Sequence, residues 1–267
     1  MLKKVALATA LVASASFATY NFFPVGAAHS GQVEAGVQYN WWEAGPADMS
    51  SMNIKLAAEY VVIDKLALSL QGLGYQLWSE NSECDDDDVP GCDTDGLKAM
   101  TVGARYWFMP MLGAALDVNI PLSSEDAVSK YDPFGLYAAV QFSMEFMPGL
   151  ALGSEAGISY KFEDENRTEG LGLTIQAELD YTIASIGLTP WVGAAFRVRL
   201  SDVEDDLGPV TNEYGSGDNA IDLWLGASYS ITQMFYVKAN FLMTFADEKE
   251  SLDHDSMGFN VKFGVNF

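Results

Sequence analysis

The chain has 267 residues, of which 49% are hydrophobic and 12% aromatic, and its 14 Lys and Arg against 37 Asp and Glu give a formal net charge of −23. This apolar and aromatic content excludes an intrinsically disordered chain, and so few basic residues argue against binding to nucleic acid. After the first 20 residues, no apolar run approaches the roughly 18 to 20 residues that a membrane-spanning helix needs. Two classes remain, a soluble acidic protein and a membrane β-barrel.

The N-terminal segment 1–18 has the pattern of a secretory signal peptide. Two lysines near the start precede an apolar stretch, and small residues follow it. Cleavage is expected after Ala15 or Ala18, with a later site after Ala28 as an alternative. The stretch is short for an anchor helix, so we expect the mature chain to be exported and 29–267 to form a single domain.

The only two cysteines are Cys84 and Cys92, which lie eight positions apart in an acidic stretch. In an oxidising compartment they are expected to form a disulfide. Closing so small a loop contributes about 2.5 kcal/mol in the chain-entropy model, so this bond would hold a loop rather than the fold. Zinc takes four N or S ligands, which two cysteines alone do not provide.

From residue 32 onward the apolar residues repeat with a period of two, which is typical of half-buried β-strands. The pattern is clearest in 257–267, where nearly every second residue is apolar. In 66–78 the phase breaks, which predicts a β-bulge beside Gly72 or Gly74. Twelve segments follow the pattern, at 32–42, 51–62, 66–78, 98–108, 112–122, 134–146, 150–162, 171–182, 188–200, 220–231, 235–246 and 257–267.

The lengths of these segments and of their connections favour a membrane barrel over a soluble sandwich. Strands of soluble proteins usually have about 5 or 6 residues, whereas tilted strands that cross a bilayer have about 9 to 11. Short turns alternate with long polar loops, as in even-stranded barrels with short periplasmic turns. The long loops lie near 43–50, 79–96, 123–133, 163–170, 201–219 and 247–256. We predict an all-β fold, a transmembrane antiparallel up-and-down β-barrel of about 12 strands, within a range of about 10 to 14.

Aromatic residues of the outward-facing parity gather at the strand ends, where interfacial girdles are expected. The last segment carries Phe263 and Val265 and ends at Phe267. On these features the chain resembles bacterial outer-membrane β-barrel proteins of the porin-like group. The resemblance implies a Gram-negative outer membrane, contacts with its lipid and lipopolysaccharide, and recognition of the strand ending in Phe267 by the barrel assembly machinery. It implies no cofactor.

The residues that alternate with the outward-facing ones are expected to line the lumen, and they include eight acids and seven bases. These are Glu34, Glu59, Asp117, Glu145, Glu155, Glu178, Asp180 and Asp222, with Lys55, Arg105, Lys161, Arg197, Arg199, Lys238 and Lys262. They either form a salt-bridged plug or line a narrow polar channel with a transverse field, and glycines such as Gly153 and Gly193 favour the channel by leaving room. Twelve strands fall between filled eight-stranded barrels and open sixteen-stranded porins.

Most of the surplus negative charge lies in the loops. These loops either form a solvated acidic rim or bind a divalent cation. Calcium is such a cation and prefers hard oxygen ligands. The candidate ligands are Asp85, Asp86, Asp87, Asp88, Asp93 and Asp95. The sequence 93–96 resembles the opening of a calcium loop but lacks the downstream Glu of an EF-hand. An acidic mouth also favours the entry of cations.

Catalysis is not expected. The only histidines are His29, in a leader expected to be flexible, and His254, in an acidic loop, and outer-membrane phospholipases carry a His-x-Ser-Asn-Gly run that this chain lacks. No nucleophile, base and orienting acid are placed as a triad requires. Two functions remain: a passive channel for small polar solutes or ions, and a closed structural or surface-interaction barrel whose acidic loops bind divalent cations, lipopolysaccharide or partners.

Overall fold

The structure is a computed structural model that describes residues 21–44, 47–81, 95–122, 134–163, 167–168, 170–205, 212–214, 216–246 and 255–267. The predicted signal peptide lies outside the described residues. So do both cysteines of the predicted disulfide and every candidate calcium ligand except Asp95.

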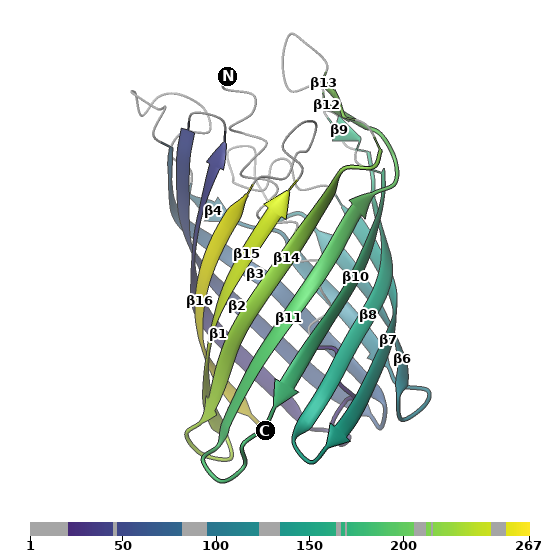
Figure 1. Cartoon of the computed structure of the whole chain (residues 1–267), viewed down its shortest axis with the longest axis vertical. Coiled ribbons are helices and arrows are strands. Elements are labelled where there is room, and N and C mark those ends of the chain that lie inside the picture. The colour runs from purple at the N-terminus through teal and green to yellow at the C-terminus, as the bar shows by residue number, and fades with distance from the viewer. Residues whose placement is uncertain are drawn as a thin grey trace.

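Twelve long strands form one closed antiparallel barrel, as the alternation predicted (Figure 1). Each pairs with its neighbours along the chain, and the first pairs with the last over Gln32↔Asn266 to Trp42↔Ser256. The strands are β1 (Gly31–Ala44), β2 (Ala47–Ile63), β3 (Leu66–Asn81), β5 (Met100–Tyr106), β6 (Leu112–Ile120), β7 (Gly135–Met147), β8 (Leu150–Lys161), β10 (Gly170–Tyr181), β11 (Leu188–Arg199), β14 (Asn219–Ser230), β15 (Phe235–Ala246) and β16 (Ser256–Asn266).

Four short strands lie at the long-loop end of the barrel (Figure 1). Strand β4 (Gly96–Leu97) pairs with β3, and β9 (Arg167–Thr168), β12 (Val203–Asp205) and β13 (Asn212–Tyr214) form a separate small sheet (Figure 1). Among the described residues, no helix is long and apolar enough to cross a membrane.

The predicted bulge in the third strand is confirmed beside Gly72. Leu56 pairs with Leu73 and Ala58 pairs with Leu70, so two residues of β3 lie opposite Ala57. Gly72 has a φ of 66°, a left-handed conformation that glycine adopts without strain. The bulge shifts the phase of the apolar residues, which is why the alternation breaks within this strand.

The predicted segment 98–108 is longer at both ends than the strand that the structure has there. Only Met100–Tyr106 is a strand in the barrel. Before it, the Lys98 N–H donates to the Gly74 carbonyl, and after it the Trp107 N–H donates to the Lys65 carbonyl. These residues alternate like a strand because their backbones still border the sheet, although they leave the regular ladder.

Burial is inverted relative to a soluble protein. Val140, on the outside of β7, is 58% exposed, whereas its neighbour Gln141 is 0% exposed on the inside. The same holds around the barrel, with apolar side chains outside and polar ones inside. Such an exterior is stable only in a lipid environment, because soluble proteins rarely expose so large an apolar surface.

Exposed aromatic rings lie at both ends of the barrel, as the girdle pattern predicted. At the short-turn end, Tyr60 stacks on the C-terminal Phe267 with ring centroids 6.4 Å apart. At the long-loop end, Tyr160 and Phe162 contact edge to face at 5.0 Å. Rings with an apolar body tolerate the headgroup region, so the two girdles mark the borders of the lipid-facing belt.

A lysine placed at the middle of this belt tests the orientation of the barrel wall. Val140→Lys is expected to lower the free energy of unfolding by about 2 to 4 kcal/mol, because the ammonium group would face the centre of the bilayer. The matched control Val33→Lys, close to the short-turn end of β1, is expected to cost about 0 to 1 kcal/mol. Denaturant unfolding in lipid vesicles measures both, and equal costs would contradict the assigned belt.

Candidate functional site

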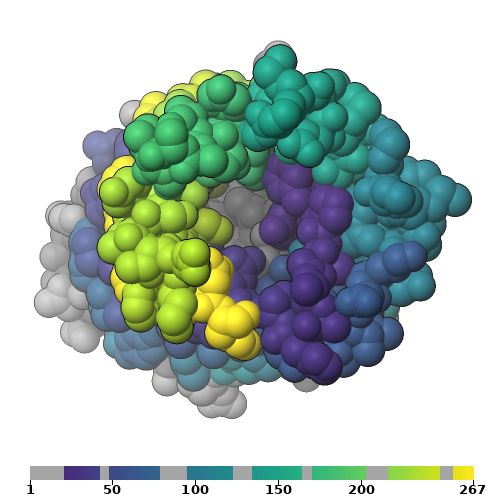
Figure 2. Space-filling model, turned by 90° about the horizontal axis from the view of Figure 1, so that it is seen from below, coloured from purple at the N-terminus to yellow at the C-terminus, as the bar shows by residue number. Residues whose placement is uncertain are grey.

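The N-terminal part of the described chain lies inside the barrel. The Arg105 guanidinium donates through Nη1 to the carbonyl oxygens of Asn21 (2.5 Å) and Phe23 (2.8 Å). Gln141 Nε2 donates to the Asn21 carbonyl at 3.1 Å. Figure 2 views the barrel from the short-turn end and shows the purple N-terminal part of the chain beside a hollow. No alternation in the sequence predicts this segment, which narrows the lumen.

Arg105 also forms a buried ion pair. Its Nη2 and Nε donate to Glu59 Oε2 at 2.5 and 2.9 Å, and the arginine is 1% exposed. The guanidinium presents five N–H donors in a fixed plane. One side chain on β5 therefore holds a carboxylate of β2 and two carbonyls of the N-terminal segment at the same time.

The segment is also tied to the short-turn rim. The His29 N–H donates to the Val61 carbonyl at 2.7 Å, and the Ala28 N–H donates to Asp64 Oδ1 at 3.2 Å. His29 Nδ1 lies 3.0 Å from the Tyr60 hydroxyl. The expectation of a flexible leader around His29 is therefore wrong, because backbone and side chain both have fixed partners on the barrel.

Glu155 and Asp117 lie on the wall against which the segment rests. Glu155 accepts hydrogen bonds from the Tyr137 hydroxyl (2.7 Å) and from Gln141 and Gln176 Nε2 (both 2.8 Å). Asp117 is 1% exposed, and neither of its carboxylate oxygens has a hydrogen-bond partner among the described residues.

Several of the predicted lumen charges are brought together as ion pairs. Glu34 contacts Lys238 at 2.5 Å and Lys262 at 3.3 Å. Arg197 binds both carboxylate oxygens of Asp222, at 2.7 and 3.1 Å. Glu34–Lys262 and Arg197–Asp222 join neighbouring strands, and Glu34–Lys238 bridges β1 and β15 across β16, so the pairs run along the wall.

Three of the predicted residues lie near the ends of their strands. Glu145 is exposed at the short-turn end, where its carboxylate accepts the Gly149 N–H at 3.0 Å. Lys161 is the last residue of β8. Arg199 is the last residue of β11 and lies 3.9 Å from Asp218.

A cavity of about 520 Å³ remains in the lumen beside the N-terminal segment. Phe22 and Phe23 of the segment border it. Of the predicted lumen residues, the cavity is lined by Glu34, Lys55, Glu178, Asp180, Asp222, Lys238 and Lys262. Small polar molecules fit a space of this size and character.

Three of the bases on the cavity wall form a row. The strand register places Lys238 beside Lys262, and Gly36 separates Lys262 from Lys55, which forms a basic row across β15, β16, β1 and β2. Glu178 and Asp180 project from β10, which lies six strands from β2 around the twelve-stranded wall. Lys55 therefore lies across the cavity from these two acids, whereas Lys238 is three strands from β10 and is paired with Glu34.

The glycines expected to leave room in the lumen are covered by aromatic rings. The ring of Trp224 lies over Gly193, and that of Trp191 lies over Gly226 on the neighbouring strand. In the N-terminal segment, Cβ and the carbonyl oxygen of Phe22 and the ring edge of Phe23 lie over Gly153. These glycines therefore provide space for rings of adjacent elements, a complementarity that only the strand register shows.

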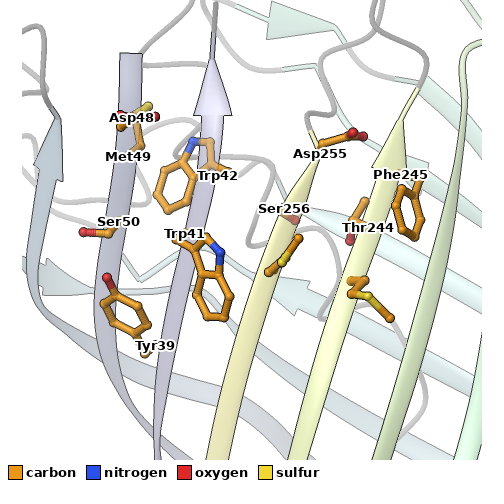
Figure 3. Close-up of a pocket in the computed structure, with 12 residues that line it drawn as sticks. Tyr39, Trp41, Trp42, Asp48, Met49, Ser50, Thr244, Phe245, Asp255 and Ser256 are labelled. Atoms are coloured by element: carbon orange, nitrogen blue, oxygen red, sulfur yellow. The ribbon is translucent and has the colours of Figure 1, made fainter. Parts of the chain in front are cut away.

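A second cavity, of about 750 Å³, lies at the long-loop end across β1, β2, β15 and β16 (Figure 3). Trp42 and Thr244 face inward and are nearly buried, whereas Tyr39 and Phe245 face outward. The described residues that line it are mostly aromatic and apolar, and the acids among them are Asp48 and Asp255.

The one described candidate calcium ligand has a protein partner. Asp95 Oδ2 accepts a hydrogen bond from the Tyr75 hydroxyl at 2.6 Å. Among the residues that the structure describes, no three His, Cys, Asp or Glu side chains are grouped as a metal site requires.

The fold is similar to that of solved bacterial outer-membrane barrels. An outer membrane channel from Pseudomonas putida F1 is 12% identical with a TM-score of 0.70, over 94% of this chain and all of that one. The NanC porin is 10% identical with a TM-score of 0.51, over 86% and 98%. The translocator domain of the autotransporter NalP from Neisseria meningitidis is 13% identical with a TM-score of 0.50, over 91% and 90%.

No protein-family model matches the sequence, and no curated protein matches it. The apolar belt, the closed barrel and these likenesses together define the fold class, that of the bacterial outer-membrane β-barrels.

Proposed function

We propose that the protein is a narrow passive channel of the bacterial outer membrane for small polar solutes or ions, without a cofactor and without enzymatic activity. The observation that carries this proposal is the charged cavity of about 520 Å³ in the lumen beside the N-terminal segment. A pathway for polar solutes needs such a space, and both acids and bases line this one. Two of the similar folds are named as a channel and a porin.

The proposal includes the partners and the location that the resemblance implies. We infer contacts with outer-membrane lipid and lipopolysaccharide around the aromatic girdles. We also infer that the barrel assembly machinery recognises β16, whose exposed Phe263 and terminal Phe267 face the lipid side.

We further propose that the channel favours cations mildly. Acids and bases are nearly balanced in the lumen, so the surplus negative charge of the loops sets the potential at the mouth. Screening confines that potential to about 10 Å at 0.1 M salt. The preference for cations is therefore expected to be stronger at low ionic strength.

Reversal potentials in a KCl gradient test this selectivity. Changing Asp85, Asp86, Asp87 and Asp88 to Asn is expected to reduce the cation preference, with the larger reduction at the lower salt concentration. Anion preference in the unchanged protein, or a cation preference that the substitutions leave intact, would show that the acidic loop does not set selectivity.

A closed structural or surface-interaction barrel is the second candidate. The hydrogen bonds from Arg105 to the N-terminal segment favour it, because they hold that segment where it narrows the lumen. Its acidic loops would bind divalent cations such as calcium, lipopolysaccharide or partner proteins. Under this alternative, deletion within loop 79–96 abolishes calcium binding or surface attachment and leaves solute uptake unchanged.

A further inference from the structure

Two carboxylates and two indole rings form a compact patch on one wall of the lumen cavity. Glu178 and Asp180 are successive inward residues of β10. On the next strand, the partner of Glu178 is Gly193 and the partner of Asp180 is Trp191. On the strand after that, Gly193 pairs with Trp224. All four side chains line the cavity.

The indole rings lie flat against the wall. Trp224 covers Gly193 with its Cε2, Cζ2 and Nε1 atoms, all at nearly the same distance from the position a Cβ would take, so the ring lies face-on over the glycine. Trp191 covers Gly226 with Cε2 and Cζ2. The Trp224 ring therefore turns one face to the backbone and the other to the cavity, and the Trp191 ring lies beside it on the wall.

Both carboxylates line the cavity beside the rings. Glu178 accepts a hydrogen bond from Trp224 Nε1 at 2.5 Å, which also fixes the ring. Asp180 Oδ1 is buried and has no hydrogen-bond partner among the described residues. Lys238, the lysine on β15 beside this wall, is held by Glu34 at 2.5 Å.

This combination has a specific chemical preference. The face of an indole ring carries negative potential and attracts cations, most strongly when water is excluded. A small inorganic cation gains little from a ring face because it retains its hydration shell, whereas an alkylated ammonium ion is weakly hydrated and presents methyl groups to the ring. A neighbouring carboxylate supplies the balancing charge when it is ionised.

We propose that Glu178, Asp180, Trp191 and Trp224 form a subsite for small organic ammonium ions on the wall of the channel. The assignment rests on the proposed channel function and names a class of solute for it, amines and quaternary ammonium compounds small enough for the cavity. The basic row at Lys55 and Lys262 lies toward the other side of the cavity, where it would orient any carboxylate on the same solute.

Isothermal titration calorimetry with tetramethylammonium chloride tests the subsite on the folded protein in non-ionic detergent. We expect saturable binding that Glu178→Gln and Trp224→Leu each weaken about tenfold, which corresponds to about 1.4 kcal/mol. Trp224→Phe is expected to retain part of the affinity because it keeps an aromatic face. Glu145→Gln makes the same chemical change at the short-turn rim, outside the cavity, and is expected to leave binding unchanged.

tert-Butanol has a similar branched shape without the charge and is expected neither to bind nor to compete. Binding that Glu178→Gln and Trp224→Leu leave unchanged in folded protein would overturn the subsite, as would equal binding of tert-butanol. Calorimetry does not depend on conduction. A protein that conducts but does not bind the ion refutes the subsite alone, and one that binds the ion but never conducts refutes the channel alone.

Discussion

A chain lacking residues 21–28, with its leader joined directly to His29, is expected to form channels with a severalfold larger unit conductance. In the intact protein this segment lies inside the barrel, where Phe22 covers Gly153 and Arg105 binds the carbonyls of Asn21 and Phe23. A twelve-stranded barrel without a filling segment has an interior wider than the filled eight-stranded barrels. Single-channel recording in planar bilayers measures the change.

The control for this deletion keeps the segment and removes only its bulk. Phe22→Ala with Phe23→Ala retains the backbone carbonyls that Arg105 binds, so we expect an intermediate conductance. A deleted chain that folds and conducts no more than the intact protein would show that the segment does not limit the pathway.

The largest expected loss of stability comes from Arg105→Met. The substitution leaves Glu59 buried at 7% exposure without its cation. Breaking a buried ion pair from one side costs about 3 to 5 kcal/mol, and here the carbonyls of the N-terminal segment also lose their donor. Guanidinium unfolding in detergent or lipid vesicles measures the change in the free energy of unfolding.

Two further variants separate the cost of the unpaired charge from general damage. Adding Glu59→Gln to Arg105→Met removes the orphaned charge and is expected to restore a large part of the loss. Arg199→Met is expected to cost less, because the Arg199–Asp218 distance of 3.9 Å already marks a weak contact. Equal losses in Arg105→Met and Arg199→Met would contradict the assigned role of Arg105.

The barrel was predictable because a lipid-facing wall imposes a period of two on each strand. Even the departure from the pattern was informative, since the broken phase in 66–78 marked the bulge at Gly72. Strand bounds were less predictable at the long-loop end, where β2 and β3 continue to pair up to Met49↔Asn81.

The inside of the barrel was predictable in composition and not in arrangement. The alternation along each strand predicted that charged residues such as Glu34 and Lys238 face inward. Only the strand register shows that the two side chains pair across strands. The cover of Trp224 over Gly193 depends equally on register. A glycine in the sequence shows where a side chain is missing, and it does not show which neighbour fills the space.

The N-terminal segment was missed because it has no periodicity. Residues 21–30 follow the small residues of the predicted signal peptide and precede the first alternating strand. The one available signal was the pair Phe22 and Phe23 in a short stretch before the barrel. Two adjacent large rings are seldom left fully exposed to water, and the structure places them in the lumen, against Gly153.

Single-channel recording of the purified protein tests the central claim, that the cavity in the lumen conducts. We predict discrete current steps in planar bilayers, and a smaller step size for Ser228→Trp, which adds a large ring to the cavity wall next to Lys238. A folded protein that gives no steps, or steps that Ser228→Trp leaves unchanged, would contradict the claim that solutes pass through this cavity.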